Sequence, residues 1–563
     1  MTDACNKHLS FKERELIILR EVVDKIDEQK GRELMNTPEV KRIVTILEAF
    51  LRKKRLICYG GTAINNILPK ADQFYDRNLQ IPDYDFFSKT PVKDAKELAN
   101  IYAKNGFDNV EAKAGVHFGT YKVFVNFIPI ADITLLDTRL FDNLMKESIR
   151  VNGIYYAAPN YLRMGMYLEL SRPAGDTSRW EKVLKRLILL NKNYPLKAKD
   201  CSSKRTANMS SSSFQRQIET FDKQKTNKIY DITLNTLIDQ DVVFFGGYAL
   251  NLFSRYMPTK YLTNIVGDKN KTKNKNKTKT KNNTKQPDFD VISLEPKLTA
   301  TLLAEQLKTG GFKGIKIVKH DAIGEIIPEH YEVRINKETV VFIYKPIACH
   351  SFNEIKIDRK TIKVASIDTI LNFYLAFLYA GKKYYNNNRL LCMASFLFDV
   401  QRHNRLSQKG LLKRFPSDCY GEQHTIDSIR TEKAAMWEKL KNKRNSAEYE
   451  MWFLSYKPTA KETKTDANKN HTRKQNKNHS SSSKNSIRNR NNNSSNFTIV
   501  NSDNDYTYVS SKSKNRTIST SNSTTKPKSV KISAKKKTQK NRKMKISHAE
   551  ANRNIMSNRA RFF

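Results

Sequence analysis

A chain of 563 residues is long enough for two or three domains with cores of their own, so its stability need not rest on crosslinks. Its 101 Lys and Arg against 57 Asp and Glu give a formal net charge of +44, which predicts a polyanionic partner, either nucleic acid or an anionic membrane surface. The membrane is the weaker candidate, because no run approaches the roughly 18 apolar residues of a spanning helix. The polar start of the chain also lacks the apolar core of a signal peptide.

The cysteines predict a reducing environment. No C-x-x-C pair occurs among the six of them, Cys5, Cys58, Cys201, Cys349, Cys392 and Cys419. Scattered single cysteines are typical of reduced thiols in a cytosol-like compartment and argue against a zinc site.

Helical spacing opens the ordered part of the chain. Residues 10 to 53 carry apolar positions at helical intervals, as in Leu16, Ile17, Leu19 and Val22. The segment "RLICYGG" then predicts a short strand ending in Gly60 and Gly61, and "TAINNIL" a helix that starts immediately after them. In a strand, Gly-Gly, helix arrangement the backbone N–H groups can approach a phosphate, although a plain connector has the same pattern.

The next segment, "QIPDYDFFS" at 80–88, places two acids in an apolar run. In a strand Asp83 and Asp85 project from one face while Tyr84 and Phe86 pack behind. Two carboxylates that close repel each other unless a cation lies between them, and oxygen ligands suit Mg²⁺ or Mn²⁺. A turn or helix cap is the alternative for an isolated Asp-x-Asp.

A third acid follows. After a helical segment at 91–106, "GTYKVFVNFIPIADITLLD" at 119–137 predicts one central strand buried on both faces, with Asp132 near its end. A strand bearing Asp83 and Asp85 beside this one would bring three carboxylates together. That is what two-metal phosphoryl transfer requires, with shared carboxylates holding two ions roughly 4 Å apart.

A basic amphipathic helix is predicted in "DTSRWEKVLKRLILL". Its apolar stripe comprises Trp180, Val183, Leu184, Leu187 and Ile188. Arg179, Lys182 and Arg186 share another face, which would hold a triphosphate or the primer backbone if it faces the acids. A solvated surface is the alternative.

These motifs recur later in the chain. "DVVFFGGYALNLF" repeats the strand, Gly246-Gly247 and helix, and "PDFDVIS" repeats the acids as Asp288 and Asp290. "VVFIYKPIACHSF" matches the third-acid segment, and this alignment places Cys349 where the first copy has Asp132.

The second copy departs from the first at two points. Cys349 is a poor ligand for Mg²⁺, and Tyr248 in place of Thr62 crowds the phosphate turn. We therefore expect residues 236–455 to form a degenerate, non-catalytic repeat that widens the RNA-binding surface.

Two segments are too polar to fold. Residues 457–563 hold 26 Lys and Arg and 5 Asp and Glu, nearly half of the net charge, and "DKNKTKNKNKTKTKNNTKQ" at 268–286 interrupts the second copy. They are interpreted as a tether and a surface loop, either solvated filler or non-specific phosphate binders.

The ordered set of motifs resembles the polymerase-β-like nucleotidyltransferases. More narrowly, "YGGTAINNIL", "PDYDFFS", "IADITLLD" and "YLRMGMYLELSRPAGDTSRWEKVLKRLILLNKNYP" resemble the catalytic subunit of poly(A) polymerases from poxviruses and giant DNA viruses, over about residues 50–400. The resemblance implies that Gly60, Gly61 and Thr62 contact the phosphates of ATP. It also implies that Asp83, Asp85 and Asp132 are catalytic and bind two Mg²⁺ or Mn²⁺ ions. Arg179 and Lys182 are the candidates for further ATP contacts.

An α/β fold of the mixed α+β kind, with two tandem nucleotidyltransferase-like domains, is the expected architecture. Its predicted parts are N-terminal helices at 1–50, a catalytic domain at 51–195, a connector at 196–235, the degenerate domain at 236–455 and a basic tail at 456–563.

The expected reaction adds AMP from ATP to the 3′ end of mRNA without a template. The alternatives are uridylation, CCA addition, oligoadenylate synthesis or AMP transfer to protein, a non-catalytic RNA-binding processivity protein, and a packaging protein. Processivity is left open between a homodimer, a separate subunit and the tail. The resemblance implies a cytoplasmic viral factory, with packaging in the virion as a second option.

Overall fold

The computed structural model describes residues 10–79, 81–196, 221–257, 288–404 and 407–458, all within one compact unit. The predictions for the 268–286 loop and for nearly all of the basic tail therefore lie outside the described residues. No helix among the described ranges is long and apolar enough to cross a membrane.

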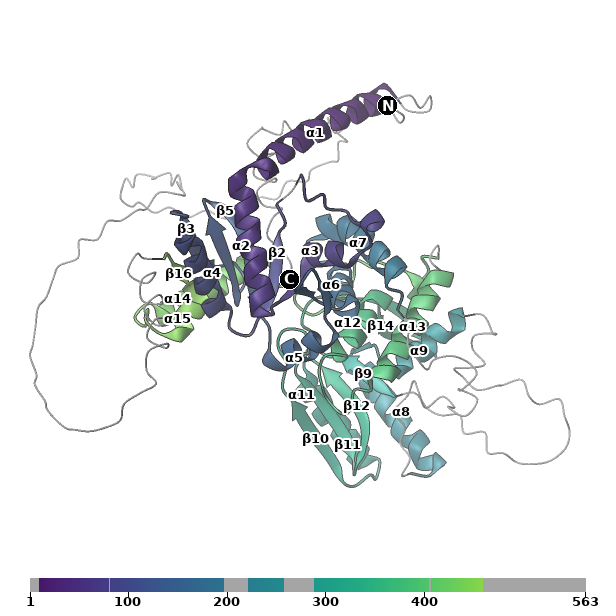
Figure 1. Cartoon of the computed structure of the whole chain (residues 1–563). Helices are drawn as coiled ribbons and strands as arrows, with labels where there is room; N and C mark the ends of the chain where they lie inside the picture. Colours follow the sequence, from purple (N-terminus) through teal and green to yellow (C-terminus); the bar gives the residue numbers. More distant parts are fainter. Residues whose placement is uncertain (1–9, 80, 197–220, 258–287, 405–406, 459–563) are drawn as a thin grey trace, which may run out of the picture. The chain divides into compact units, whose positions relative to one another are not determined.

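Two mixed sheets organise this unit, with helices packed against both (Figure 1). The first has the order β16-β3-β4-β5-β2-β1-β7-β6. Its strands are β1 (Ile57–Tyr59), β2 (Tyr84–Ser88), β3 (Val110–Ala114), β4 (Thr120–Val125), β5 (Ile128–Leu135), β6 (Ile149–Val151), β7 (Ile154–Tyr156) and β16 (Ser455–Tyr456).

The second sheet has the order β10-β11-β12-β9-β8-β14-β13-β15. Its strands are β8 (Val243–Phe244), β9 (Phe289–Ile292), β10 (Ile315–His320), β11 (His330–Ile335), β12 (Glu338–Tyr344), β13 (His350–Ile357), β14 (Lys360–Ala365) and β15 (Cys419–Tyr420). From β3 to β6 and from β10 to β13 the two orders correspond strand for strand. The predicted duplication and the mixed α/β class are confirmed.

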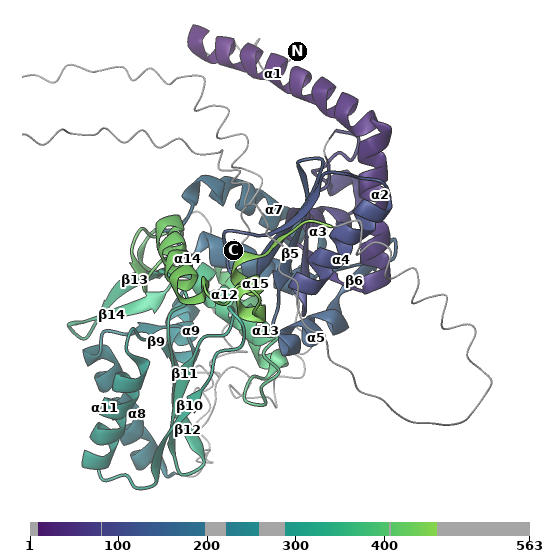
Figure 2. The same ribbon diagram turned by 90° about the vertical axis from the view of Figure 1, so that its left-hand side faces the viewer.

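Helices follow the strands at equivalent places in the two copies. The first copy carries α3 (Gly60–Ile67), α4 (Pro91–Lys104), α5 (Thr138–Glu147), α6 (Pro159–Leu170) and α7 (Trp180–Asn193). The second carries α8 (Lys223–Asp239), α9 (Gly247–Phe253), α11 (Pro296–Thr309), α12 (Ile367–Phe377), α13 (Asn387–His403), α14 (Ile426–Leu440) and α15 (Ala447–Phe453). Figures 1 and 2 show α8 and α11 side by side against the strands β10–β12, and α11 contacts both α8 and these strands.

The predicted N-terminal helices are α1 (Phe11–Asn36) and α2 (Pro38–Lys54). Thr37 accepts a hydrogen bond from the N–H of Val40 and so caps the start of α2. The buried face of α2 packs on the first sheet, whereas α1 extends beyond it with several apolar side chains exposed (Figure 2).

The apolar run at 119–137 forms a hairpin, so the prediction of one continuous strand is wrong. β4 and β5 pair antiparallel around Asn126 and Phe127, whose φ angles are 49° and 65°. Two consecutive positive φ angles are typical of the tight turn that suits a twisted hairpin. Phe127 is apolar and therefore continued the apolar pattern of the sequence, although its side chain is 84% exposed at the tip of the turn.

Several contacts join the copies within the compact unit. Helices α6 and α12 pack against each other, and Asn372 Nδ2 donates to the carbonyl oxygen of Met164 at 3.2 Å. The N–H of Ser351 donates to the carbonyl oxygen of Ser171 at 2.8 Å. The second copy therefore supports the first copy by direct packing and hydrogen bonds.

The last described residues return to the first sheet. β16 pairs with β3, and α15 packs on β3 as well. The sequence assigned residues 447–455 to the second domain and Tyr456 to the tail. The predicted domain limits stay a prediction.

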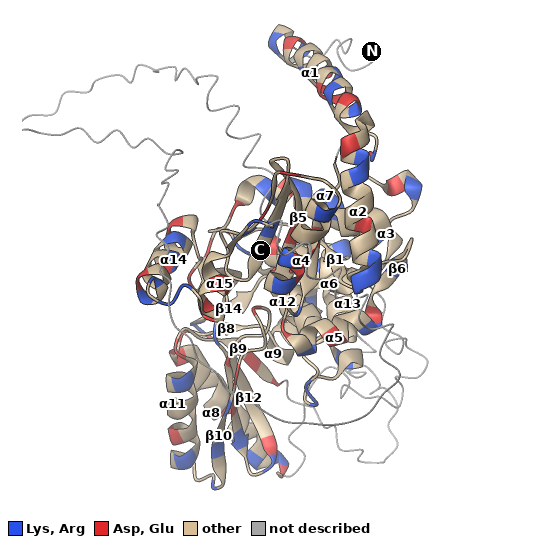
Figure 3. Ribbon diagram, turned by 60° about the vertical axis from the view of Figure 1, so that its left-hand side comes forward, with Lys and Arg blue, Asp and Glu red and all other residues tan. Residues whose placement is uncertain are grey.

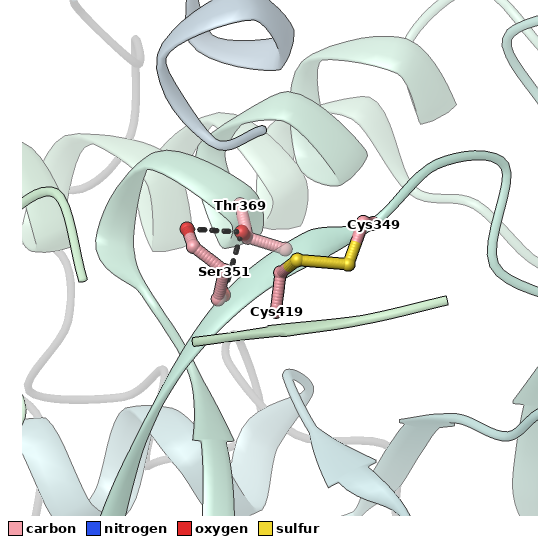
Figure 4. Close-up of a disulfide and its surroundings, with 4 residues drawn as sticks. All are labelled: Cys349, Ser351, Thr369 and Cys419. Carbon is pink, nitrogen blue, oxygen red and sulfur yellow. Dashed lines mark hydrogen bonds between the residues drawn. A yellow bond between two sulfur atoms is a disulfide. The ribbon is translucent and has the colours of Figure 1, made fainter. Parts of the chain in front are cut away.

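The cysteine pattern was misleading. Cys349 and Cys419 form a disulfide with a Cα–Cα distance of 5.1 Å (Figure 4). Cys392 is also disulfide-bonded. The prediction of reduced thiols is wrong for these three residues, while Cys58 is a buried free thiol. The reason is tertiary: antiparallel pairing of β13 with β15 joins residues 70 positions apart, a distance that no local motif reveals.

Candidate active site

Two of the predicted acids lie side by side on the first sheet. β2 and β5 are parallel, and their register pairs Asp85 with Asp132. On either side of them, Tyr59 pairs with Asp85 and Lys122 with Asp132, so one row of side chains runs across four strands. Asp132 lies within β5 rather than at its end, where the sequence placed it.

Asp85 is held in an unfavourable environment. It is 9% exposed, and its pKa is raised well above the usual range by burial first and then by the charges of Asp83 and Asp132. Lys122 and Arg179 act in the opposite direction. Lys122 Nζ contacts Asp132 Oδ2 at 2.5 Å, which partly compensates the negative charge of the row.

Asp83 precedes β2 and is exposed. Its carbonyl oxygen accepts a hydrogen bond of 2.6 Å from the Oγ1 of Thr62. The Thr62 hydroxyl therefore fastens the start of α3 to the acidic strand. A phosphate contact from Thr62 would use its backbone N–H.

Both positions of the first turn require glycine, because neighbouring side chains approach the backbone too closely to leave room for a Cβ. Gly60 has φ +73°, and a Cβ there would lie 2.5 Å from Asp85 Oδ2. A Cβ on Gly61 would lie 2.7 Å from the hydroxyl oxygen of Tyr75 and 3.0 Å from the guanidinium of Arg186. The turn thus brings backbone, carboxylate and cation to one point, and its role as a phosphate site stays a prediction.

The basic face of α7 is directed at the acids. The charge of Arg179 lowers the pKa of Asp85, and Asp83 raises that of Lys182. Burial and the neighbouring arginines lower the pKa of Lys182 overall, which shows that the three cations crowd together. Arg186 is only 5% exposed. The alternative of a purely solvated face is excluded for Arg186.

The apolar stripe of α7 was predicted too widely. Val183 and Leu187 are buried as expected, and Trp180 and Leu184 pack partly buried against the core. Ile188 is 58% exposed, so its place in the stripe is wrong. Leu190, one turn from Leu187, takes the buried position.

Two residues of the site escaped the sequence analysis. Lys122 was hidden in an alternating strand segment, and only the register of β4 with β5 shows that it reaches Asp132. Tyr75 comes from the loop before β2, and Arg186 Nη2 donates to its hydroxyl at 2.5 Å. No sequence signal marked Tyr75.

In the second copy, Phe342 replaces the third acid. β9 and β12 are parallel like β2 and β5, and their register pairs Asp290 with Phe342. The predicted equivalence of Cys349 with Asp132 is therefore wrong, because Cys349 follows β12 and belongs to the disulfide. Phe342 is fully buried and has no metal-binding group.

The other acids of the second copy are enclosed. Asp288 and Asp290 are each 6% exposed, and Arg389 Nη2 contacts Asp288 Oδ2 at 3.1 Å. A Cβ on Gly247 would lie 2.2 Å from Asp288 Oδ1, so a carboxylate fills the turn. Tyr248 packs its ring against Phe244 and Phe289. An anion has no room at this turn.

The donor chemistry of the first copy fits a divalent cation. Within the described part of the chain, no group of three or more His, Cys, Asp or Glu side chains is arranged to hold a metal ion. Asp83, Asp85 and Asp132 nevertheless interact closely enough to raise the pKa of Asp85. Carboxylate oxygens under such mutual repulsion are the donors that Mg²⁺ and Mn²⁺ prefer.

A mixed sheet that presents acids beside a Gly-Gly turn and a basic helix defines the nucleotidyltransferase-like class. A solved structure of the Megavirus polyadenylate synthase matches with a TM-score of 0.63 and 22% sequence identity, over 84% of this chain and 93% of that one. At this identity the match establishes the fold.

Sequence comparison narrows the class. Residues 45–176 match the family model of the poly(A) polymerase catalytic subunit. The chain is 35% identical over 162 residues to a protein of Acanthamoeba polyphaga mimivirus assigned as a poly(A) polymerase catalytic subunit, covering 28% of this chain and 27% of that protein. A similarly assigned protein of African swine fever virus is 31% identical over 168 residues, 29% of this chain and 35% of its own. The predicted resemblance to viral poly(A) polymerase catalytic subunits is thus confirmed for this part of the chain, which aligns with about a third or less of each relative.

Proposed function

We propose that this protein is a polynucleotide adenylyltransferase that adds AMP from ATP to the 3′ end of mRNA without a template. The observation that carries the proposal is the pairing of Asp85 with Asp132 beside the Gly60-Gly61 turn. The matches to viral poly(A) polymerase catalytic subunits in the same region support adenosine as the nucleotide.

The reaction is a phosphoryl transfer. The 3′-oxygen of the RNA forms a bond to the α-phosphorus of ATP, the bond from that phosphorus to the bridging oxygen breaks, and pyrophosphate leaves. The proton of the 3′-hydroxyl passes to water. Catalysis of this step requires positioning and charge neutralisation rather than a covalent intermediate.

Backbone and basic groups of the chain would position the triphosphate of ATP. The backbone N–H groups of Gly60, Gly61 and Thr62 open α3, where an anion is favoured. Arg179 and Lys182, with Arg186 behind them, bring positive charge to the same place. We assign these groups to the triphosphate of ATP.

The acids hold the metal. Asp83, Asp85 and Asp132 would bind two Mg²⁺ or Mn²⁺ ions. Bound by these carboxylates, such ions would supply Lewis-acid chemistry, which would lower the pKa of the attacking hydroxyl and neutralise the leaving pyrophosphate. Lys122 contacts Asp132 at 2.5 Å and holds this carboxylate in position beside Asp85.

The second copy acts as a scaffold and an RNA-binding surface in this proposal. Phe342 in place of an acid and the ion pair of Arg389 with Asp288 support a non-catalytic role. A homodimer or a separate subunit would add processivity. The site of action would be the cytoplasmic viral factory, as the viral relatives suggest.

Primer extension tests the proposal. The full chain is given RNA, Mg²⁺ or Mn²⁺ and each nucleoside triphosphate separately, beside Asp85→Asn/Asp132→Asn and the matched control Asp290→Asn. We expect long tails with ATP, lost in the double variant and kept in the control. Preference for another nucleotide would refute the substrate, and equal loss in the control would refute the assignment of the site.

A further inference from the structure

The proposed function fixes the side from which the RNA must come. The attacking and leaving oxygens lie roughly in line on opposite sides of the phosphorus. The leaving pyrophosphate belongs to the Gly60-Gly61 turn, at the start of β2. The 3′-hydroxyl must therefore approach the Asp85–Asp132 row from the other end of the strands.

A cavity lies at that end. Its volume is about 410 Å³, and its walls include Phe87, Thr134, Tyr161 and Phe118. Phe87 and Thr134 pair in the next row of the same face, two residues beyond Asp85 and Asp132. Two residues along a strand span roughly 6.6 Å, so the cavity adjoins the acids.

The second copy closes this cavity. A tight loop contributes Gly324, Glu325 and Ile326, and it is braced by paired hydrogen bonds between Ile323 and Ile327. Gly324 packs on α5, with Leu140 and Asp137 nearest to it. A fixed wall from the repeat makes this a formed pocket within the usual range of roughly 300–1,000 Å³ for small ligands.

The walls suit a nucleoside. Phe118 is 37% exposed and offers an aromatic face on which any base can stack, whereas Phe87 is buried, with its ring stacked on Tyr59 at 3.9 Å, and forms the floor of the cavity. Tyr161 is 3% exposed, and its hydroxyl has no hydrogen-bond partner among the residues that the structure describes. Buried hydroxyls normally have partners, so this one is available to a ligand.

A larger groove continues from the cavity. Its volume is about 770 Å³, and Lys89 and Leu135 line both spaces. It runs along α4 and α15, where its basic residues are Lys53, Lys89, Lys93, Lys96 and Lys104. Figure 3 shows the basic positions on α4.

Some lysines of the groove have no ion pair with other described residues. Lys89 pairs with Asp142 and Lys96 with Glu450, each at 2.5 Å. Lys53 and Lys93 are exposed, and neither has an ion pair with another described residue. Glu97 also lines the groove and contacts Lys54 at 2.5 Å. The balance is positive, which favours a phosphate backbone.

We propose that the 3′-terminal nucleoside of the RNA sits in the cavity of Phe87, Phe118 and Tyr161, and that the preceding phosphates follow the lysine groove along α4. This inference rests on the proposed function. It assigns the RNA a path on the first copy, away from the triphosphate side.

The internal repeat supplies a matched control. α11 is the counterpart of α4 in the second copy, of the same 14-residue length and also begun by proline. It carries exposed Lys297 and Lys308 but lines none of these cavities. Leu298 stands where α4 has Lys93.

The groove is tested by the salt dependence of binding. The full chain is titrated with a 20-nucleotide oligoadenylate in EDTA without ATP. Each lost phosphate contact should reduce the slope of log K against log salt by about 0.7, so Lys53→Gln/Lys93→Gln should lower it by about 1.4. Lys297→Gln/Lys308→Gln should leave it unchanged. Equal slopes in both variants would overturn the path.

The cavity is tested with 2-aminopurine at the 3′ end of the same oligomer. Binding should quench its fluorescence, and Phe118→Ala should remove the quenching and weaken binding on the order of tenfold. The exposed Phe127→Ala is the control for loss of a phenyl ring. Tyr161→Phe removes only a hydroxyl that has no partner among the described residues, so we expect unchanged stability, a raised KM for RNA and an unchanged KM for ATP. Quenching that survives Phe118→Ala would refute the cavity.

Primer extension run in parallel separates the two proposals. If no nucleotide is incorporated but the slopes and quenching change as expected, the function is wrong and the RNA path stands. If ATP is incorporated while all path variants keep the wild-type KM for RNA, the function stands and the path is wrong.

Discussion

Asp85 lies beside Asp132 across the parallel strands β2 and β5, and Lys122 contacts Asp132 at 2.5 Å on the far side. With Asp83, the row carries three carboxylates, and the charges of Lys122 and Arg179 only partly compensate them. The folded chain stores electrostatic repulsion at this point, and the repulsion can be measured as both stability and activity.

Replacing Asp85 by asparagine should separate these two effects. Asp85→Asn keeps the shape and removes a buried charge that its neighbours oppose, so the melting temperature without metal should rise. Primer extension should fall by roughly 10³-fold, because metal binding contributes several kcal/mol to the transition state. Calorimetry and extension assays check the pair. A fall in both would show that Asp85 is structurally required instead.

The stability difference should depend on pH. The pKa of Asp85 is raised in the folded state. The folded protein therefore binds this proton more tightly than the unfolded chain does, in which aspartate has a pKa of about 3.9. The contribution of protonated Asp85 is fully present below pH ~4 and is lost as pH rises through the raised folded pKa. The melting-temperature gap between Asp85→Asn and wild type should therefore be widest at neutral pH and close near pH 4. A gap that does not change with pH would refute the raised pKa.

Gly60 and Gly106 form a matched pair for the phosphate turn. Both have positive φ, +73° and +82°, but a Cβ on Gly60 meets Asp85 whereas one on Gly106 meets nothing within 4 Å. Gly106→Ala should cost only the backbone strain of about 1 kcal/mol, with normal activity. Gly60→Ala should lose extension activity as well. Chemical denaturation and extension assays distinguish them, and equal activity in the two variants would contradict the close approach.

Arg186 should affect ATP more than RNA. Its guanidinium donates to Tyr75 and lies 5.0 Å from the ring centre of Phe74, so it is held firmly beside the Gly61 turn. Arg186→Met should raise the KM for ATP about tenfold or more, as expected for loss of a charged contact. Tyr75→Phe keeps the charge and should have a smaller effect. An increase in the KM for RNA alone would contradict this role.

The disulfide between Cys349 and Cys419 should stabilise the second copy. Closing a loop across a sequence separation of 70 residues restricts the unfolded chain by typically about 2–4 kcal/mol. Cys349→Ser/Cys419→Ser should lower the melting temperature in non-reducing buffer. The difference from wild type should shrink in reductant, where the wild-type bond opens too. Equal melting temperatures without reductant would show that the bond contributes nothing.

Local patterns determined the elements and the order of the motifs. The Gly-Gly turn at the start of a helix, a strand carrying Asp85 and the repeat of both were correctly predicted, because each is encoded within about ten consecutive residues. The prediction that Asp83 shares this strand is wrong, because β2 begins at Tyr84. The identity of strand order in the two sheets confirms that the repeat in the sequence is a repeat in the fold.

Pairing between distant segments was decided by the tertiary structure. Sequence alignment placed Cys349 opposite the acids of the second copy, but the register of β9 with β12 places Phe342 there. The sequence likewise did not reveal the contact of Lys122 with Asp132 or the disulfide, because both depend on strand pairing. It also missed the turn at Asn126–Phe127.

The sequence by itself thus determined which chemical groups this protein possesses and that it possesses the scaffold twice. The tertiary structure decided which of those groups meet. The physical reason is that strand register depends on the packing of whole sheets, and a shift of one residue would turn every side chain to the opposite face.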